Sequence, residues 1–197
     1  MSEIQPANGE PLRILDVGGT TAFWEHRGLG GASGVSITLV NLHEEVSDHP
    51  NIVGLKADAT DLRQFDDGSF DMVFSNSVIE HLFSLEAQQA MAMEVRRVGR
   101  GYWVQTPNFW FPVEPHFLTP AWHWLPRSVR VAALRRHRFG WRGPCPDPDD
   151  ARRLVEEIRL MRPREVRSIF PDARLVRERV FGVTKSLIAV RAPDRQP

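Results

Sequence analysis

The sequence predicts an α/β protein built on an open, mostly parallel sheet. Short β-rich runs alternate with helical or broken segments along the first half of the chain, as in proteins with parallel sheets. Parallel neighbours need crossover connections, which are right-handed in nearly all such sheets. The length of 197 residues and the 42% hydrophobic content suit one domain with a full core.

The first strand is expected over residues 12–17, and its end is the first candidate for a ligand site. Residues 14–17 form an apolar run that leads into Gly18-Gly19 and two threonines. Glycines tolerate positive φ and let a ligand approach the backbone. The crevice beyond the strand ends of an open α/β sheet suits a nucleotide or nucleoside. The alternative is a turn without a ligand.

The remaining elements follow from apolar periodicity and turn signals. A helix is predicted over 85–98, because Met91, Val95 and Val98 share one face, and another helix is expected to open near Asp61. Residues 1–11 are expected to be a loose lead-in. The other predicted strands are 35–42, 52–56, 69–75, 101–106, 174–180 and 183–190, and the other predicted helices are 149–161, with Leu154, Ile158 and Met161 inward, and 164–170.

Residues 108–148 differ in character and are predicted to be an insertion. The first part is rich in Phe, Trp and Pro, and residues 127–142 carry several arginines and no acidic residue. Three interpretations stay open: a lid with a small core of its own, an acceptor site that offers flat aromatic faces, or a membrane-surface contact through residues 108–142.

Composition narrows the class of partner and the compartment. The formal net charge is zero, which gives no electrostatic support for a nucleic-acid partner. Cys145 is the single cysteine, so an internal disulfide and a thiolate cluster are excluded. No run approaches ~20 apolar residues, and the first residues lack the pattern of a signal peptide. A cytoplasmic location is therefore expected.

Three motifs carry a resemblance to a known family. They are ILDVGG at 14–19, ADATDL at 57–62 and FDDGSFDMVFSNSVIEHL at 65–82. Over about residues 12–191 the chain resembles the small class I S-adenosylmethionine-dependent methyltransferases. That resemblance implies a single domain over 1–197 with a Rossmann-like sheet of seven strands, mostly parallel with the last strand antiparallel, and helices on both faces. It also implies S-adenosylmethionine as cofactor and S-adenosylhomocysteine as product.

The same resemblance implies a set of cofactor-binding residues. Gly18, Gly19 and Thr20 would line the amino-acid and ribose part, and Asp58 would accept a hydrogen bond from the adenine amino group. The end of the second strand usually carries an acid for the ribose, but here it holds Asn41, with Glu44 and Glu45 close behind. Ser75, Asn76 and Ser77 would lie near the reactive sulfonium. The full set is Asp16, Gly18, Gly19, Thr20, Asn41, Leu42, Asp58, Ala59, Ser75 and Asn76.

Two histidines are the candidate catalytic residues. His116 follows the fifth strand, near Glu114, and could take a hydroxyl proton; the alternative is a histidine that only fixes its loop. His81 follows the fourth strand; its alternative is packing behind a capping box formed by Ser77 and Glu80. No metal site is predicted, because Glu114, His116 and His123 lack a recognised ligand spacing.

The segment TPNFWFPVEPHF at 106–117 resembles methyltransferases of polysaccharide and glycolipid synthesis. This looser resemblance implies O-methylation of a small-molecule or oligosaccharide acceptor. The residues expected to bind the acceptor are Glu114, Trp110, Phe111 and Trp122. The competing hypothesis is a non-catalytic methyltransferase-like binding module or partner subunit.

Overall fold

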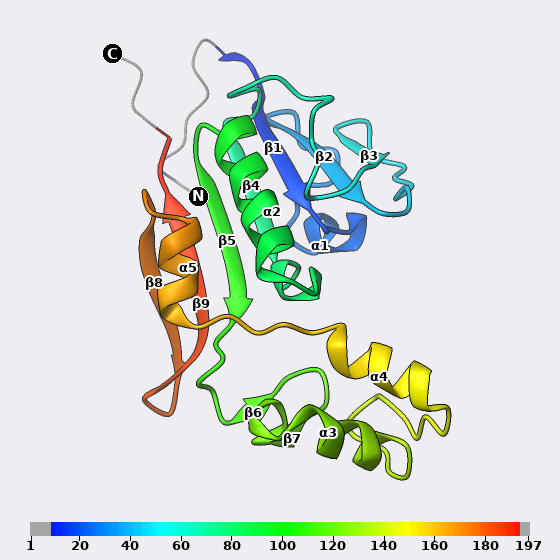
Figure 1. Ribbon diagram of the computed structural model, residues 1–197. Coiled ribbons are helices and arrows are strands. Elements are labelled where there is room, and N and C mark those ends of the chain that lie inside the picture. Colours follow the sequence, from blue (N-terminus) through cyan, green and yellow to red (C-terminus); the bar gives the residue numbers. More distant parts are fainter. Residues whose placement is uncertain (1–8, 194–197) are drawn as a thin grey trace.

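The computed structural model describes residues 9–193, and its centre is one seven-stranded sheet (Figure 1). The strand order is β3-β2-β1-β4-β5-β9-β8; β9 runs antiparallel to both of its neighbours, and the other pairs are parallel. The predicted sheet class is confirmed. The strands are β1 Leu12–Val17, β2 Val35–Asn41, β3 Ile52–Lys56, β4 Met72–Asn76, β5 Tyr102–Pro107, β8 Arg174–Val180 and β9 Val183–Arg191.

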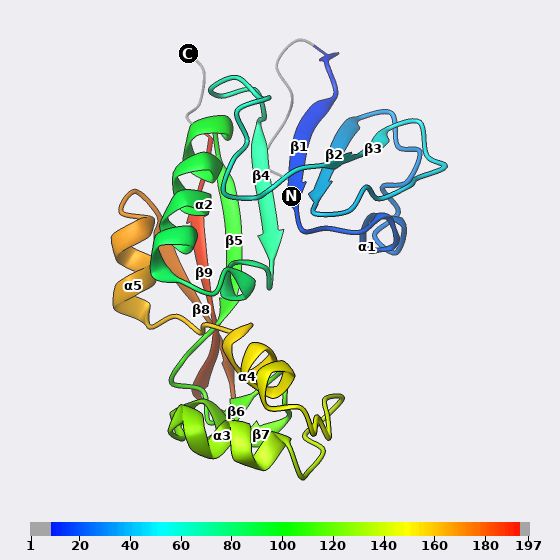
Figure 2. The same cartoon turned by 45° about the vertical axis from the view of Figure 1, so that its right-hand side comes forward.

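Helices cover both faces of the sheet (Figures 1 and 2). Helix α1, Thr21–Glu25, places Trp24 in a cluster with Ile14 on one face, whereas α2, Leu85–Val98, and α5, Pro163–Ile169, pack with Leu15 on the other. Successive side chains of a strand point to opposite faces, so β1 contributes to both cores. The sheet is therefore buried on both sides, as its apolar strands require.

The helix expected to open near Asp61 is absent. The Asp58 carboxylate accepts hydrogen bonds from the backbone N–H and the hydroxyl of Thr60, at 2.8 and 2.7 Å. The Arg97 guanidinium donates to the carbonyl oxygens of Leu62 and Phe65. These side-chain bonds compete with the bonds that a helix would form, so residues 57–71 fold as turns before β4.

The chain between β5 and α5 forms a lobe beyond the carboxyl ends of β4 and β5 (Figures 1 and 2). We call residues 108–157 the insertion lobe. It holds strands β6 Val113–Glu114 and β7 Thr119–Pro120 and helices α3 Arg127–Leu134 and α4 Pro148–Glu156. Its small core consists of Phe117, Trp122, Leu134, Ala151 and Val155. The lobe thus extends past residue 148, the predicted end of the insertion.

Helix α4 is shorter than the predicted helix over 149–161. It begins at Pro148, behind the capping side chain of Asp147, and buries Ala151 and Val155. Beyond it, the backbone N–H of Arg159 donates to the carbonyl of Glu80, and the carbonyl of Met161 accepts from Phe109. Because these backbone groups bond to the rest of the molecule, they do not continue the helix.

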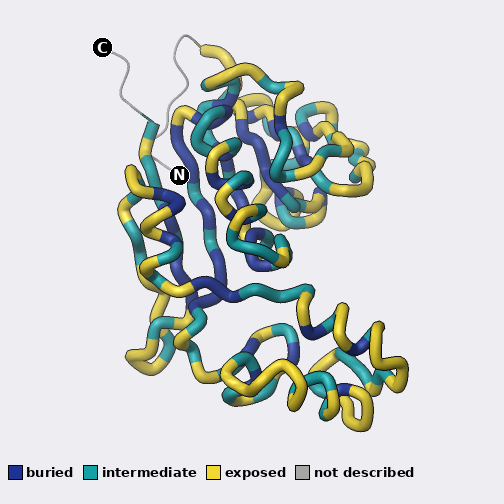
Figure 3. The backbone as a smooth tube through the Cα atoms, viewed as in Figure 1, coloured by how far each residue is buried: buried dark blue, intermediate teal, exposed yellow. Residues whose placement is uncertain are grey.

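Buried residues are concentrated in the sheet, whereas the surface of the insertion lobe is exposed. Figure 3 shows buried segments concentrated in the strands, while the outer turns of the insertion lobe are exposed. No helix of the described residues is long and apolar enough to cross a membrane. Residues 1–8 of the predicted lead-in lie outside the described part.

Candidate active site

A cavity of about 820 Å³, larger than the two others described below, lies at the carboxyl ends of β1, β2 and β3. This is the position where open α/β sheets bind their ligands. Most of the predicted cofactor residues line it, whereas three of them do not: Asp16, Ser75 and Asn76. The lining members are Gly18, Gly19, Thr20, Asn41, Leu42, Asp58 and Ala59.

The glycine pair forms a turn that no larger residue would fit. Gly18 has φ +79°, and a Cβ atom there would lie 2.4 Å from Cγ2 of Val78. A Cβ atom on Gly19 would lie 1.8 Å from Oδ2 of Asp16. Both positions therefore present bare backbone to the cavity, as a ligand loop does. This observation fits a nucleoside cofactor at the end of β1.

Asp16 lies beneath this loop rather than in the cavity. Its side chain is buried, and Oδ2 accepts a hydrogen bond of 2.7 Å from Nε1 of Trp24. Burial raises the pKa of Asp16 to about 7, although the Trp24 hydrogen bond and the charge of Arg27 oppose the increase. Asp16 therefore supports the glycine turn from below.

Asp16→Asn should make folding stability less dependent on pH. Because the folded pKa of about 7 exceeds the value of 3.8 without burial, the stabilising contribution is complete below pH ~4 and is lost as pH rises through ~7. The wild-type protein should lose at most about 4 kcal/mol more than the variant over this range. Urea unfolding of both proteins at pH 4, 5 and 8 measures this. Subtracting the variant's free energy of unfolding from that of the wild type removes the contributions of the titrating groups that both proteins share. Parallel pH curves would contradict it.

The residues after β4 divide between structure and cavity. Ser75 is buried, and its hydroxyl donates to the carbonyl of Val17 at 3.0 Å, which ties β4 to β1. Asn76 is exposed outside the cavity. Ser77 does line the cavity, and its hydroxyl donates to Oε1 of Gln105 at 2.8 Å. Of these three serine and asparagine side chains, Ser77 is the one beside the predicted cofactor.

The end of β2 uses its amide to hold the glycine loop. Nδ2 of Asn41 donates to the carbonyl of Gly19 at 2.8 Å. The carboxylate of Glu45 accepts from the backbone N–H of Thr21 at 3.1 Å, whereas Glu44 is exposed and lines the cavity. Glu44 is therefore a carboxylate in the cavity wall with no backbone hydrogen bond like that of Glu45, next to the position of Asn41 where the sequence pattern expects an acid.

Two histidines meet between the large cavity and a smaller one of about 200 Å³. His81, in the 3₁₀ turn Ile79–His81, lines the large cavity, and His116, after β6, lines the smaller one. Their ring centroids are 4.9 Å apart in an edge-to-face arrangement. Burial and the neighbouring His116 lower the pKa of His81. The two predicted catalytic residues, far apart in sequence, are thus in contact.

Glu114 fixes the imidazole of His116. Oε1 of Glu114 lies 2.7 Å from Nδ1 of His116, and Oε2 accepts from the backbone N–H of Phe117, also at 2.7 Å. Glu114 is buried and His116 half-buried. Because Nδ1 is engaged, Nε2 is the nitrogen left for a substrate or an ion. The hydrogen bond that fixes the loop and a chemical role are therefore compatible.

The capping box of Ser77 and Glu80, which was the alternative interpretation for His81, does not form. Glu80 points into the interior, where Oε2 accepts from the hydroxyl of Thr106 at 3.1 Å and Oε1 has no partner among the described residues. Burial raises the pKa of Glu80 to about 7, and the Thr106 hydrogen bond opposes this increase. Ser84 caps α2 instead. Sequence reasoning missed Glu80 as a site residue, although it directly precedes His81 in the third motif.

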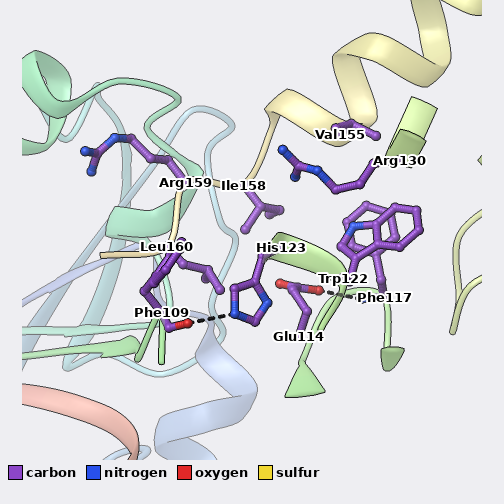
Figure 4. A pocket seen from close by; sticks show the side chains of 10 residues that line it. All are labelled: Phe109, Glu114, Phe117, Trp122, His123, Arg130, Val155, Ile158, Arg159 and Leu160. Atoms are coloured by element: carbon purple, nitrogen blue, oxygen red, sulfur yellow. Dashed lines mark hydrogen bonds between the residues drawn. The ribbon is translucent and has the colours of Figure 1, made fainter. Parts of the chain in front are cut away.

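A third cavity of about 180 Å³ lies between the insertion lobe and residues 158–160, which follow it (Figure 4). Glu114 and Trp122 are in its wall. The rings of Phe117 and Phe139 pack 4.6 and 4.5 Å from that of Trp122, so Trp122 belongs to the core of the lobe and is buried. Trp110 is exposed, and Phe111 lines the 200 Å³ cavity. Of the three predicted aromatic residues, Phe111 is therefore the one that shares a cavity with His116.

The strand order, the glycine turn and the cavity at the strand ends define a class I methyltransferase fold. Residues 15–101 match the family model described as methyltransferase domain. Over this segment the chain is similar to the class I S-adenosylmethionine-dependent methyltransferases, whose cofactor is S-adenosylmethionine.

Curated relatives match over part of their length. The uncharacterized proteins Rv1509 and MT1557, from two strains of Mycobacterium tuberculosis, are each 32% identical over 106 residues, which are 54% of this chain. The match covers 34% of each relative. The chain therefore spans about a third of the length of the curated relatives it matches.

Three solved structures share the fold at 13% identity. A Rhodobacter sphaeroides protein described as a Zn-dependent alcohol dehydrogenase has a TM-score of 0.58, covering 95% of this chain and 86% of its own. An O-methyltransferase family protein from Burkholderia thailandensis has 0.54, covering 92% and 51%. The 1,6-didemethyltoxoflavin-N1-methyltransferase of the same species, with bound S-adenosylhomocysteine, has 0.53, covering 92% and 71%. At this identity the likeness concerns the fold alone.

Proposed function

We propose that this chain methylates a hydroxyl oxygen of a small-molecule or carbohydrate acceptor. S-adenosylmethionine supplies an electrophilic methyl group, and transfer forms a carbon–oxygen bond, breaks the cofactor's carbon–sulfur bond and releases one proton. Alignment and exclusion of water provide much of the catalysis in such a displacement. Because an alcohol must also lose its proton, the site needs a group that assists this loss.

The observation that carries the proposal is the Glu114–His116 pair. The buried carboxylate orients the imidazole at 2.7 Å, and Nε2 of His116 remains for the acceptor. An amine that is already neutral needs no such pair, whereas a hydroxyl benefits from it. His81 contacts His116 and also lines the large cavity proposed for the cofactor. It therefore connects the Glu114–His116 pair to that cavity.

The small cavity suits a hydroxyl-rich acceptor. Its wall combines polar groups, which can exchange hydrogen bonds with hydroxyls, with a few flat apolar surfaces. The polar side chains are those of Ser77, Gln105, Asn108, His116, Lys185 and Ser186, and the apolar ones include Pro107 and Phe111. The insertion lobe would act as the lid on the acceptor side. Lipid contact through residues 108–142 stays a prediction, supported by the exposed Trp110, Trp124 and Leu125.

The direct test is a transfer assay with methyl-labelled S-adenosylmethionine. Oligosaccharides and glycolipid precursors serve as acceptors, and product analysis identifies the methylated atom. A methyl ether is the expected product. Methylation of nitrogen alone would overturn the choice of oxygen, and turnover that never exceeds the rate without acceptor would favour the second hypothesis.

The second hypothesis is a non-catalytic binding module. It is favoured by the end of β2, where Asn41 replaces an acid and uses its amide on Gly19. Titration calorimetry with S-adenosylhomocysteine, with NADH as the contrast, distinguishes the two hypotheses. Binding of the adenosyl ligand supports the enzyme, and failure to bind it would favour the module.

Asp58→Ala should weaken S-adenosylhomocysteine binding by about 1–3 kcal/mol, because the adenine amino group would lose its acceptor. Asp58 lines the cavity and also holds the turn through Thr60. Thr60→Val removes the hydroxyl from that turn and keeps the carboxylate, so it serves as the matched control. Calorimetry that gives equal affinities for Asp58→Ala and the wild type would remove the adenine role.

A further inference from the structure

Three side chains of metal-binding type converge between the two cavities. Glu80 and His81 follow β4, and His116 follows β6. One candidate ligand atom from each lies within 4.8 Å of the other two. Two imidazoles and one carboxylate form a ligand set that transition metals use with positions left open. The cluster unites segments from the sheet and from the insertion lobe.

The buried carboxylate of Glu80 lacks a partner on one side. Its Oε2 accepts from Thr106, but Oε1 is buried without a hydrogen bond from any described residue. A buried, unpaired carboxylate oxygen costs free energy. A cation at the centre of the cluster would provide the missing partner.

A carboxylate oxygen also lies near Nδ1 of each histidine. Glu114 lies 2.7 Å from Nδ1 of His116, and Oε1 of Glu157 lies 3.9 Å from Nδ1 of His81. Glu157 is in turn held by Arg142. Metal-binding histidines usually have such a carboxylate on the nitrogen that does not bind the ion, because it fixes the tautomer and the ring orientation. The cluster therefore has a set of ligands and, in Glu114, a hydrogen-bonded group that orients one of them, whereas Glu157 lies only at ion-pair distance from His81.

We infer that Glu80, His81 and His116 bind one divalent transition-metal ion of the kind that prefers imidazole, such as Zn²⁺ or Co²⁺. Three protein ligands leave open positions, which would face the two cavities. The role of the ion rests on the proposed function, because an acceptor hydroxyl at an open position loses its proton more readily. With the ion bound, Nε2 of His116 is a ligand and the hydroxyl proton passes to solvent water; without the ion, Nε2 takes that proton itself. Mg²⁺ is not expected, because it prefers oxygen ligands.

Metal titration of the full chain tests this without any acceptor. Protein stripped with EDTA is titrated by calorimetry with Zn²⁺, Co²⁺ and Mg²⁺, and the visible absorption of the Co²⁺ adduct is recorded. We expect one Zn²⁺ or Co²⁺ per chain and no saturable Mg²⁺ binding. His81→Ala, His116→Ala and Glu80→Gln should each weaken binding by about tenfold or more. His137→Ala removes an exposed histidine of the insertion lobe and should bind as the wild type does.

The outcomes separate the metal site from the methyltransferase. Circular dichroism melting in metal-free buffer checks the fold of each variant; if Glu80→Gln unfolds, the two partly exposed histidines still decide the test. Absent Zn²⁺ and Co²⁺ binding, equal binding by the ligand variants, or a thiolate absorption band from Cys145 would overturn the site. Full methyl transfer by the metal-free chain would also overturn the ion's role while leaving the proposed function intact. Conversely, tight binding at the three ligands would uphold the site even if no acceptor were methylated.

Discussion

Replacing His116 by alanine should lower methyl-transfer turnover by about 100- to 10,000-fold, the usual contribution of a group that assists proton transfer. His116 lines the acceptor cavity, whereas its partner Glu114 does not. The carboxylate of Glu114 therefore cannot replace the imidazole. S-adenosylhomocysteine affinity should change by less than about twofold, because a group outside the cofactor cavity does not contribute to ground-state cofactor binding. Steady-state kinetics at saturating acceptor measures the turnover, and titration calorimetry with S-adenosylhomocysteine measures the affinity.

Two companion variants make this result specific. His137→Ala, an exposed histidine of the same lobe, should retain wild-type turnover. Glu114→Gln tests a positioning residue, and it should lower kcat while KM changes little, because the imidazole remains but is held less firmly. Added imidazole should restore part of the activity of His116→Ala. Wild-type turnover in His116→Ala would eliminate the residue from the mechanism.

Replacing Gly18 by alanine should destabilise the protein and weaken cofactor binding together. The left-handed backbone at φ +79° costs a residue with a side chain about 1–2 kcal/mol. The contact of 2.4 Å with Cγ2 of Val78 adds about 1–3 kcal/mol of overpacking, since either the loop or Val78 must move. Because the same loop forms the cavity wall, S-adenosylhomocysteine affinity should fall by about tenfold or more. Urea unfolding and calorimetry measure the two effects.

Gly28 provides the matched control for that experiment. It has a similar φ of +70°, but a Cβ atom there would meet nothing within 4 Å. Gly28→Ala should therefore show the backbone cost alone and keep the affinity for S-adenosylhomocysteine. The difference between the two variants isolates the contact with Val78. Equal loss of stability in both variants, with affinity unchanged in both, would show that the Gly18 loop does not shape the cavity.

Elements that depend on local pattern were predicted closely from the sequence. Strand β1, Leu12–Val17, and helix α2, Leu85–Val98, have the predicted bounds, because apolar spacing and the glycines or caps beside them act over a few residues. The Glu114–His116 contact was also within reach of sequence reasoning, since the two residues are near neighbours in the chain. The glycine pair at 18–19 likewise predicted a turn beside a cavity, because a positive φ and a close approach are local requirements.

Where prediction failed, long-range contacts had displaced a local preference. Arg97, distant in sequence, holds the carbonyls of residues 62 and 65, so no helix opens near Asp61. Helix α4 ends early because Arg159 and Met161 bond to the backbone of Glu80 and Phe109. Trp122, which was expected to offer its face to an acceptor, is buried against Phe117 and Phe139. Each outcome depends on a partner that no local window contains.

The sequence by itself determined the class of sheet, the cofactor end of that sheet and the two histidines worth testing. Only the tertiary structure decided that His81 and His116 touch, and that Glu80 joins them with an unpaired oxygen. The spacing around Glu80 also favoured a helix cap, a local use of the same carboxylate. The Glu80 carboxylate is buried against Thr106 instead, because the turn that follows β4 packs on β5. Strand and helix signals are local free-energy preferences, whereas the cluster forms when the insertion lobe and the sheet pack together.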